Sequence, residues 1–163
     1  MIRNAQLLKL DDIDRKILTI LQRDATQSVQ DIADVVGLTS NPCWRRIKRM
    51  EDEGLILRRV AVVDPGKLGF GMTAFVRIST ETHTKDWLTT FKASVKVIPE
   101  IVECHRMTGD VDYLLKIVVE DLSHYDKVYQ RLLDLVPNLK DVSAAFSMER
   151  MKEGEGINLA TMG

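Results

Sequence analysis

Cysteine is scarce in this sequence of 163 residues, which contains only Cys43 and Cys104. The two residues lie far apart and belong to no CxxC or Cys/His spacing. The sequence therefore predicts neither a disulfide framework nor a zinc site. We expect both thiols to be buried, as free cysteines usually are.

Long hydrophobic runs are also missing. No apolar stretch approaches the roughly 20 residues that a helix needs to cross a bilayer, and residues 1–12 lack the apolar segment of a secretion signal. We therefore expect a cytoplasmic protein with no membrane partner. The 45% of hydrophobic and 29% of charged residues are typical of a soluble globular chain with one ordinary domain or two small ones.

An excess of basic charge is absent as well, since 23 lysines and arginines face 24 aspartates and glutamates. A net charge of −1 is unusual for a protein that binds nucleic acid. The total hides how charge is distributed along individual segments, however, so it excludes no partner by itself.

Two short helices are predicted first, over residues 11–23 and 28–37, because apolar residues recur in both at helical spacing. Asp11, followed three residues later by Asp14, is suited to cap the first helix. Ser28 begins a capping box at the second helix, and the glycine at residue 37 is suited to end it.

A third helix is predicted between Asn41, which is suited to the N-cap, and Gly54, which is suited to the position after the C-terminus. Pro42 fits the first helical position. At 100° per residue, Trp44 and Ile47 fall on the face that packs on the domain. This spacing is one residue later than in the commonest helix-turn-helix, so we expect a turn that is one residue longer.

The charges of this third helix run against its dipole. Basic side chains come first and acidic ones last, although helix termini favour the opposite order by about 0.3 to 1 kcal/mol per charge. An ordinary solvated face is one interpretation. An anionic partner is the interpretation we favour, because the second helix of a helix-turn-helix enters the major groove of DNA. The basic residues are Arg45, Arg46, Lys48 and Arg49, and the acidic ones are Glu51, Asp52 and Glu53.

We therefore predict a surface that binds double-stranded DNA. Polar residues at the helix tip can donate to phosphates or base edges, the arginines can reach guanine edges or phosphates, and the lysine can reach a phosphate. Since one helix offers few contacts, specific binding needs a dimer that reads two half-sites about one helical turn apart. The predicted DNA-binding residues are Thr39, Ser40, Asn41, Arg45, Arg46, Lys48 and Arg49.

A strand and a linker are predicted after the third helix. Residues 55–64 are rich in β-branched side chains, which favour a strand. The glycines of the following stretch PGKLGFG mark a domain boundary. We predict a helix-turn-helix DNA-binding domain with its following strand over residues 1–63, a linker over 64–71 and a second domain over 72–163.

The second domain is predicted to have the element order βαββαβ. Two halves of similar length, joined by a hairpin at Gly109, indicate a ferredoxin-like fold with one antiparallel sheet and both helices on one face. The fold class is thus α+β, with an N-terminal helix-turn-helix (winged-helix-like) domain. The open face needs a cover, so we expect a sheet-to-sheet dimer. Strands are predicted over 72–80, 101–107, 112–120 and 141–149, and helices over 84–98 and 121–136.

Over nearly its whole length the sequence resembles the leucine-responsive and asparagine-responsive regulators of the Lrp/AsnC (feast/famine) family. The order and spacing of four stretches carry this resemblance: LDDIDRKILTILQRD, IADVVGLTSNPCWRRIKRMEDEGLI, VVDPGKLG and ECHRMTGDVDYLLKIVVEDLSHY. The resemblance implies a transcriptional regulator with an amino-acid-sensing second domain, homodimers formed through the sheets, and higher assembly, often octamers. LTSNPCWRR looks closest to a branch associated with cysteine metabolism, so cysteine is the first effector to test.

The resemblance also implies an effector pocket at the contact between dimers, near the turn that joins the second and third strands. Backbone N–H groups at Gly109 can bind the effector's carboxylate, and Asp110 or Asp112 its ammonium group. A plain hairpin is the alternative, because glycine and aspartate also suit tight turns. No cofactor is expected besides an amino-acid effector. The residues carried over are Met107, Thr108, Gly109, Asp110, Asp112 and Tyr113.

Two other classes of protein compete with a regulator. An enzyme would need a cluster such as His105, Asp110 and Asp112, but no nucleophile, glycine-rich phosphate loop or metal-spaced motif accompanies these residues. We therefore expect no catalytic and no metal-binding residues. An effector-independent architectural protein that bends DNA would use the same basic helix and would differ only at the hairpin.

Overall fold

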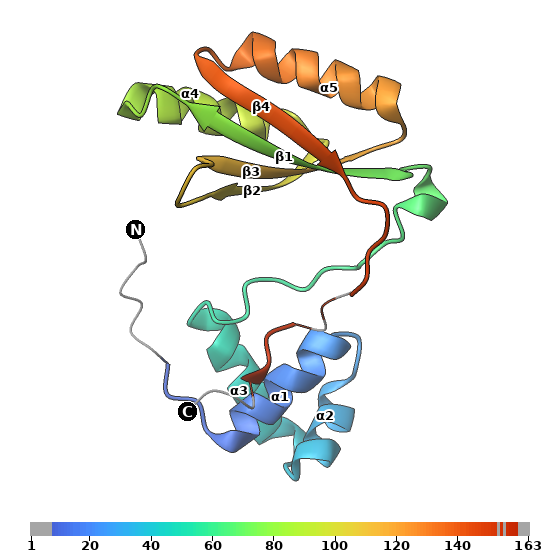
Figure 1. Cartoon of the computed structure of the whole chain (residues 1–163). Helices are drawn as coiled ribbons and strands as arrows, with labels where there is room; N and C mark the ends of the chain where they lie inside the picture. Colours follow the sequence, from blue (N-terminus) through green and yellow to red (C-terminus); the bar gives the residue numbers. More distant parts are fainter. Residues whose placement is uncertain (1–7, 153, 155, 160–163) are drawn as a thin grey trace. The chain divides into compact units, whose positions relative to one another are not determined.

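The computed structural model describes residues 8–152, 154 and 156–159, and the chain folds into two compact units (Figure 1). Among the described residues, the helical unit comprises residues 8–62 with 152, 154 and 156–159, and the sheet unit comprises Val63–Met151. Our predicted second domain ran unbroken to residue 163, whereas the described residues from 152 to 159 group with the helices. The side-chain amide of Gln22 donates to the Ile157 carbonyl at 3.2 Å, and its oxygen accepts from the Ile157 amide at 2.7 Å.

In the part of the chain that the structure describes, the helical unit contains α1 (Asp12–Arg23), α2 (Val29–Val36) and α3 (Ser40–Asp52). Complete capping boxes begin α1 at Asp11 and α2 at Ser28, which confirms both predicted helix starts. The apolar faces of the three helices meet in one core, formed by Ile17, Leu18, Ile32, Ala33, Val36, Cys43, Ile47 and Met50.

The start of α3 differs from our prediction by two residues. Thr39 occupies the N-cap position, and Pro42 is the third helical residue, where an N–H group would have had no partner within the helix. The turn between α2 and α3 comprises only residues 37–39. The longer turn that we predicted is therefore wrong, because Cys43 and not Trp44 is the first buried residue of the helix.

Gly54 ends α3 as predicted. Its φ of +71° lies in the left-handed region that glycine adopts without a steric penalty. The Leu55 amide donates to the Met50 carbonyl at 2.9 Å and the Gly54 amide to the Glu51 carbonyl at 3.0 Å. This pair of hydrogen bonds is a Schellman motif, which satisfies carbonyl groups that the helix leaves without a partner.

The strand predicted within residues 55–64 is absent. Residues 57–64 belong to no strand and are exposed along their whole length. A strand requires a second backbone to complete its hydrogen bonds, and among the described residues the sheet contains only the four strands of the sheet unit. The prediction is wrong because β-branched composition indicates a side-chain preference and does not supply a partner.

The sheet unit has the predicted element order βαββαβ. Its strands are antiparallel and lie in the order β2-β3-β1-β4, and the two long helices cover one face of the sheet (Figure 1). The α+β fold class is thereby confirmed. After a short 3-10 turn at Gly66–Leu68, the elements are β1 (Met72–Thr80), α4 (Lys85–Lys96), β2 (Ile101–Arg106), β3 (Tyr113–Val119), α5 (Leu122–Leu135) and β4 (Leu139–Phe146).

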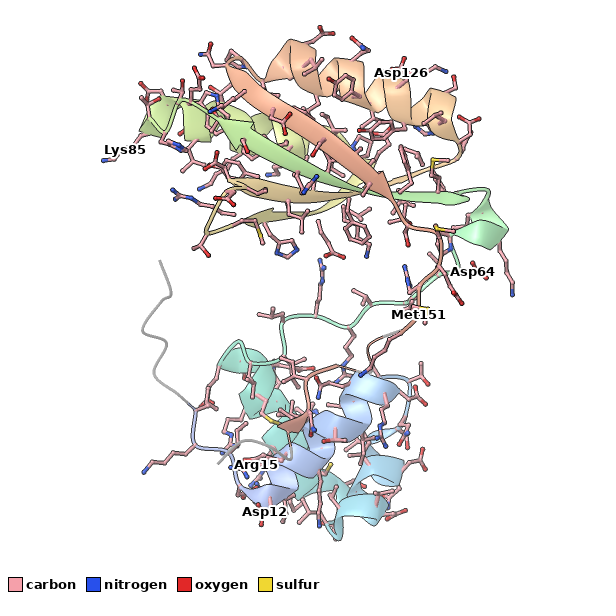
Figure 2. The ribbon with its side chains drawn as sticks, in the orientation of Figure 1. Asp12, Arg15, Asp64, Lys85, Asp126 and Met151 are labelled. Atoms are coloured by element: carbon pink, nitrogen blue, oxygen red, sulfur yellow. The ribbon has the colours of Figure 1, made fainter. Side chains whose placement is uncertain are left out.

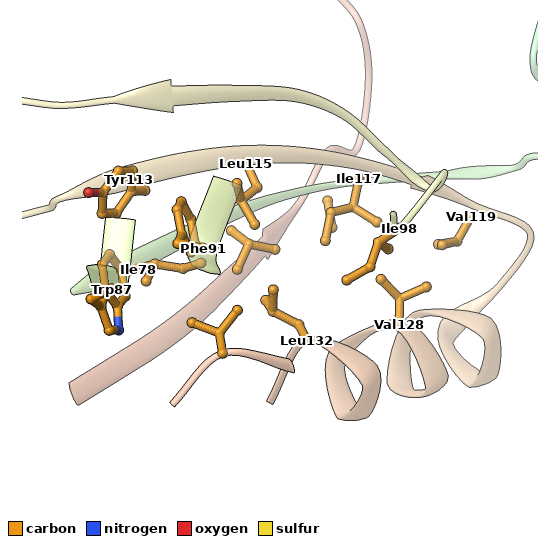
Figure 3. Close-up of a cluster of buried hydrophobic side chains, with 13 residues drawn as sticks. Ile78, Trp87, Phe91, Ile98, Tyr113, Leu115, Ile117, Val119, Val128 and Leu132 are labelled. Atoms are coloured by element: carbon orange, nitrogen blue, oxygen red, sulfur yellow. The ribbon is translucent and has the colours of Figure 1, made fainter. Parts of the chain in front are cut away.

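The core of the sheet unit lies between the sheet and its two helices (Figure 3). Trp87 stacks on Phe91 with ring centroids 5.1 Å apart, and Phe91 contacts Tyr113 at a centroid distance of 4.3 Å. The indole N–H of Trp87 donates to the Pro137 carbonyl at 2.7 Å, so its polar atom is paired. This aromatic group fixes the end of the sheet that carries the β2–β3 hairpin.

No helix of the sheet unit covers the opposite face of the sheet. Phe75 on β1 lies there, in register with Lys116 on β3 and Ala145 on β4, and its side chain is 39% exposed. We call the face around these three residues the open sheet face. It combines an aromatic ring with a charged neighbour. Such a mixed surface can be covered either by water or by a partner.

Cys43 is buried as predicted, but Cys104 is exposed. The expectation of two buried thiols is wrong for Cys104 because it belongs to the edge strand β2, most of which is exposed. Among the described residues, no helix combines the length and the apolar character that crossing a membrane requires.

Candidate nucleic-acid interface and ligand-binding hairpin

The buried face of α3 is narrower than predicted. Cys43, Ile47 and Met50 recur at i, i+4 and i+7 and pack into the helical core. Trp44 is 52% exposed, so the prediction that it holds α3 to the domain is wrong. One residue beyond Cys43 turns about 100° around the helix, which is enough to carry the indole out of the core.

The exposed face of α3 presents Asn41, Trp44, Arg45 and Lys48, which recur at i, i+3, i+4 and i+7. We call these four residues the contact face. Arg45 has no ion pair with any residue that the structure describes. Lys48 Nζ lies 2.8 Å from Asp52 Oδ1, but such exposed pairs are worth about 0 to 1 kcal/mol. Both cationic groups are therefore available to an anion.

The predicted residues at the tip of α3 differ in their contacts. The Ser40 hydroxyl donates to Gln30 Oε1 on α2, which ties the start of α3 to its neighbour. Thr39 makes no side-chain capping hydrogen bond, and both Thr39 and Asn41 are exposed. The tip therefore offers a hydroxyl and an amide group close to the leading end of the helix.

Arg46 and Arg49, which we predicted to contact DNA, bind a buried carboxylate of α1. Arg46 Nη1 donates to Asp14 Oδ1 at 2.8 Å, and Arg49 Nη2 donates to Asp14 Oδ2 at 2.6 Å. Arg46 Nη1 also donates to Asp11 Oδ2 at 2.7 Å. We call these four residues the Asp14 cluster. We expected all four basic side chains of α3 to be available to DNA. This expectation is wrong for Arg46 and Arg49, because both already have anionic partners within the protein.

Burial explains why the carboxylate of Asp14 needs ion-pair partners. Asp14 is 1% exposed, and an unpaired carboxylate at such depth would cost several kcal/mol. Hydrogen bonds to Asp11 and then Asp14 raise the pKa of the Arg46 guanidinium. The amide of Asp14, followed by Arg46, lowers the pKa of the Asp11 carboxyl.

The predicted effector residues lie in and beside the hairpin between β2 and β3. The Met107 amide donates to the Asp112 carbonyl at 2.8 Å, which closes the hairpin. Gly109 has a φ of +101°, a conformation that the turn requires and that favours glycine. Thr108, Gly109 and Asp110 are exposed, so the tip presents a hydroxyl, a carboxylate and backbone groups.

Asp112 and Tyr113 have structural contacts at the base of this hairpin. Asp112 Oδ2 accepts from the Thr80 amide at 2.8 Å, and its own amide donates to the Ile78 carbonyl at 3.0 Å. Tyr113 is 4% exposed and packs in the aromatic core, where burial raises the pKa of its phenol. The base is therefore held rigidly, and the exposed groups belong to the tip.

His105, the histidine of the rival enzyme site, lies in a separate set of contacts. Its Nε2 is 3.3 Å from Glu103 Oε2, and Lys116 Nζ donates to Glu103 Oε1 at 2.8 Å. These hydrogen bonds, that from Lys116 first, lower the pKa of the Glu103 carboxyl. His105 thus pairs with Glu103, whereas Asp112 binds the Thr80 amide.

The sequence prediction missed the roles of two residues of this candidate interface. Asp14 reads as part of a helix cap, yet it stands three residues before Ile17 and four before Leu18, on the buried side of α1. A carboxylate at a core position needs a cationic partner, and this requirement could have predicted a pair with Arg46 or Arg49. Trp44 is apolar by composition, and no local signal places its indole outside the core.

Comparison with known proteins agrees with this geometry. Residues 10–56 match the winged helix-turn-helix DNA-binding family, and residues 73–157 match the Lrp/AsnC ligand binding domain. The DNA-binding transcriptional activator DecR of Escherichia coli K12 is 47% identical over 143 residues, covering 88% of this chain and 94% of that protein. The glutamate uptake regulatory protein of Zymomonas mobilis is 48% identical over 144 residues, covering 88% and 87%.

Two solved structures are similar along most of the chain. An AsnC family transcriptional regulator from Agrobacterium tumefaciens has a TM-score of 0.89 at 48% identity and covers 94% of this chain and 99% of its own. A transcriptional regulator from Neisseria meningitidis, solved as a complex with L-Met, has a TM-score of 0.87 at 30% identity and covers 93% and 97%.

A helix-turn-helix unit joined to a ligand-binding α+β unit defines a class of transcriptional regulators that combine both parts in one chain. The chain belongs to the Lrp/AsnC family, which confirms the resemblance seen in its sequence. This family consists of transcriptional regulators and not of enzymes. The enzyme interpretation of His105, Asp110 and Asp112 is therefore excluded.

Proposed function

We propose that this chain is a sequence-specific, DNA-binding transcriptional regulator whose DNA binding or assembly is controlled by a small amino acid. The observation that carries the DNA-binding part is the contact face, where Arg45 and Lys48 stand exposed beside Asn41 and Trp44. The relatives named as transcriptional regulators support the same function. A regulator that meets both DNA and metabolites would work in the cytoplasm.

On double-stranded DNA, α3 would enter the major groove with its N-terminal end leading. In this arrangement Arg45 reaches a guanine edge, Lys48 reaches a phosphate, and the polar tip donates to phosphates or bases. Each guanidinium has five N–H donors, so the arginines of the Asp14 cluster retain donors for the flanking backbone. The proposed DNA-binding residues are Thr39, Ser40, Asn41, Trp44, Arg45, Arg46, Lys48 and Arg49.

The open sheet face is our proposed dimer interface. Phe75 would be covered there by the same face of a second chain, and Lys116, already paired with Glu103, adds little repulsion. Two helical units would then read two half-sites, joined to their sheets by linkers over residues 64–71. Dimers would assemble further, to octamers in the arrangement that the family resemblance implies.

The exposed hairpin tip is our proposed effector site, completed by a neighbouring dimer. Backbone N–H groups at Gly109 would bind the carboxylate of an amino acid, and Asp110 would bind its ammonium group. Met107 and Thr108 supply the adjoining wall, while Asp112 and Tyr113 hold its base in place. The L-Met complex of the Neisseria relative supports a small amino acid as the ligand, so methionine joins cysteine among the first candidates.

Thermal unfolding with each of the twenty amino acids tests the effector site. A ligand at about 100 times its Kd adds roughly 2.7 kcal/mol to the free energy of unfolding, which raises Tm. We expect one amino acid to raise Tm and to change the affinity for DNA. Asp110→Asn should weaken this response, and Asp126→Asn, which removes the same charge from an exposed residue of α5, should preserve it.

The screen also separates the two kinds of DNA-binding protein. If no amino acid changes Tm or DNA affinity while the chain still binds DNA, the effector part of the proposal is wrong. An effector-independent architectural protein that bends DNA would then be the function.

A further inference from the structure

The Asp14 cluster places an internal anion beside the helix that we propose to bind DNA. Both arginine partners of Asp14 come from α3, although the carboxylate itself belongs to α1. The side chain of Arg46 is 28% exposed and that of Arg49 is 42% exposed, so both remain accessible from solvent. A phosphate that approaches α3 would therefore meet arginines that already hold a carboxylate.

Counting formal charges shows how much of the positive charge of α3 this cluster neutralises. The two carboxylates of Asp11 and Asp14 contribute −2 and the two guanidinium groups contribute +2, so the cluster is neutral. Only Arg45 and Lys48 then remain as cations outside the cluster on the basic half of α3. Half of the basic side chains of this segment are thus neutralised by Asp11 and Asp14, and Lys48 has only the exposed pair with Asp52 of its own helix.

We propose that Asp14 is an intramolecular counterion that competes with DNA phosphates for Arg46 and Arg49 and thereby restrains binding to non-specific DNA. The inference rests on the proposed DNA-binding function. Non-specific affinity arises almost entirely from cations that neutralise phosphates, whereas base contacts supply specificity. An internal anion lowers the non-specific affinity, because it neutralises cations that would otherwise bind phosphates. It leaves the base contacts of the contact face unchanged, and so it raises the ratio of specific to non-specific affinity.

Carboxylates and phosphates bind arginine in the same way, through charge-assisted hydrogen bonds to planar N–H donors. Asp14 therefore occupies the N–H groups that a phosphate oxygen would otherwise accept from. Asp11 strengthens the competition, because its exposed carboxylate shares Nη1 of Arg46 with Asp14. A purely structural role would require only that the cluster be neutral, and it would leave the salt dependence of DNA binding unaffected.

Asp12 and Asp14, both in the first turn of α1, allow a matched test on the full chain. Asp14→Asn removes the buried charge, and Asp12→Asn removes the same charge from a side chain that is 91% exposed (Asp12 is labelled in Figure 2). Among the described residues, Asp12 has only a 4.0 Å pair with Arg15 of its own helix. The measurement is the Kd for a random-sequence DNA duplex as a function of salt concentration.

We expect Asp14→Asn to bind the random duplex more tightly and with a steeper salt dependence. Each released arginine should steepen the slope of log K against log salt by about 0.9, so that the affinity loss between 50 and 200 mM salt grows roughly threefold. Asp12→Asn should follow the wild type. Equal slopes and affinities for a folded Asp14→Asn and Asp12→Asn would overturn the proposal.

Asp11→Asn keeps the test decisive if Asp14→Asn does not fold. Asparagine caps helices as well as aspartate does, so this variant preserves α1 while it removes one of the two carboxylates that hold Arg46. The slope of log K against log salt for this variant should lie between the slope of Asp12→Asn and the slope expected for Asp14→Asn. A slope equal to that of Asp12→Asn would overturn the counterion role. Failure of the wild type to bind any DNA would instead overturn the proposed function.

Discussion

At the scale of single residues, Trp44 most changes the interpretation of α3. Its indole is 52% exposed on a helix whose other exposed residues, apart from Pro42, are polar or charged. Large aromatic side chains are rarely left in water without a reason, and exposed apolar surface often marks an interaction site. The contact face thus has an apolar part, which suits a thymine methyl group or a deoxyribose beside the bases that we propose Arg45 to read.

Trp44→Ala should therefore weaken DNA binding and leave stability nearly unchanged. An exposed substitution changes the free energy of unfolding by about 0.5 kcal/mol or less, whereas truncating a buried tryptophan costs about 3 to 5 kcal/mol. The checks are urea unfolding and the Kd for a selected duplex. Val35→Ala, which truncates a residue of α2 that is 69% exposed, serves as the control. A large loss of stability with unchanged DNA affinity would show that Trp44 belongs to the core.

Some residues of the site were predictable because their signals are local. The caps at Asp11 and Ser28 depend on a partner three residues away, and both formed as predicted. The pairing of Asp14 with Arg46 joins residues that are 32 positions apart, and it depends on how α1 and α3 pack. Sequence periodicity gives the buried faces of these helices but not which charged flanks meet.

At the scale of elements, periodicity predicted the helices and strands of the sheet unit well. β1 and β3 alternate between buried and intermediate or exposed residues, and that alternation is visible in their sequences. Residues 57–64 have a similar composition but form no strand, since a strand also needs a neighbour to pair with. Elements stabilised within themselves were therefore easier to predict than an element that depends on a partner.

The C-terminus of α3 provides a test at this scale. Gly54→Ala should lower the free energy of unfolding by about 1 kcal/mol, because the left-handed backbone disfavours any residue with a Cβ atom. The added Cβ meets nothing within 4 Å, so the cost is one of backbone conformation alone. Gly154→Ala adds the same methyl group in open space without a positive φ. Equal urea unfolding curves for the two variants would contradict the Schellman assignment.

At the scale of the whole molecule, the sequence predicted two parts and their fold class, but not that the chain returns to its first part. Residues 156–159 group with the helical unit, where Leu159 packs against the helical core. No sequence motif within residues 156–159 predicts this contact. Its hydrogen bonds to Gln22 depend on the positions of atoms that are 135 residues apart.

The most direct test of the account is the binding of the full chain to duplexes selected from a random DNA library. We expect the wild type to protect two half-sites about one helical turn apart, as a dimer does that inserts two copies of α3. Arg45→Ala should lose about tenfold or more in affinity, since a good base contact is worth about 1 to 3 kcal/mol. Lys92→Ala, which removes the same charge from an exposed position of α4, should bind and protect like the wild type. An unchanged footprint and affinity in Arg45→Ala would contradict the claim that α3 reads the DNA.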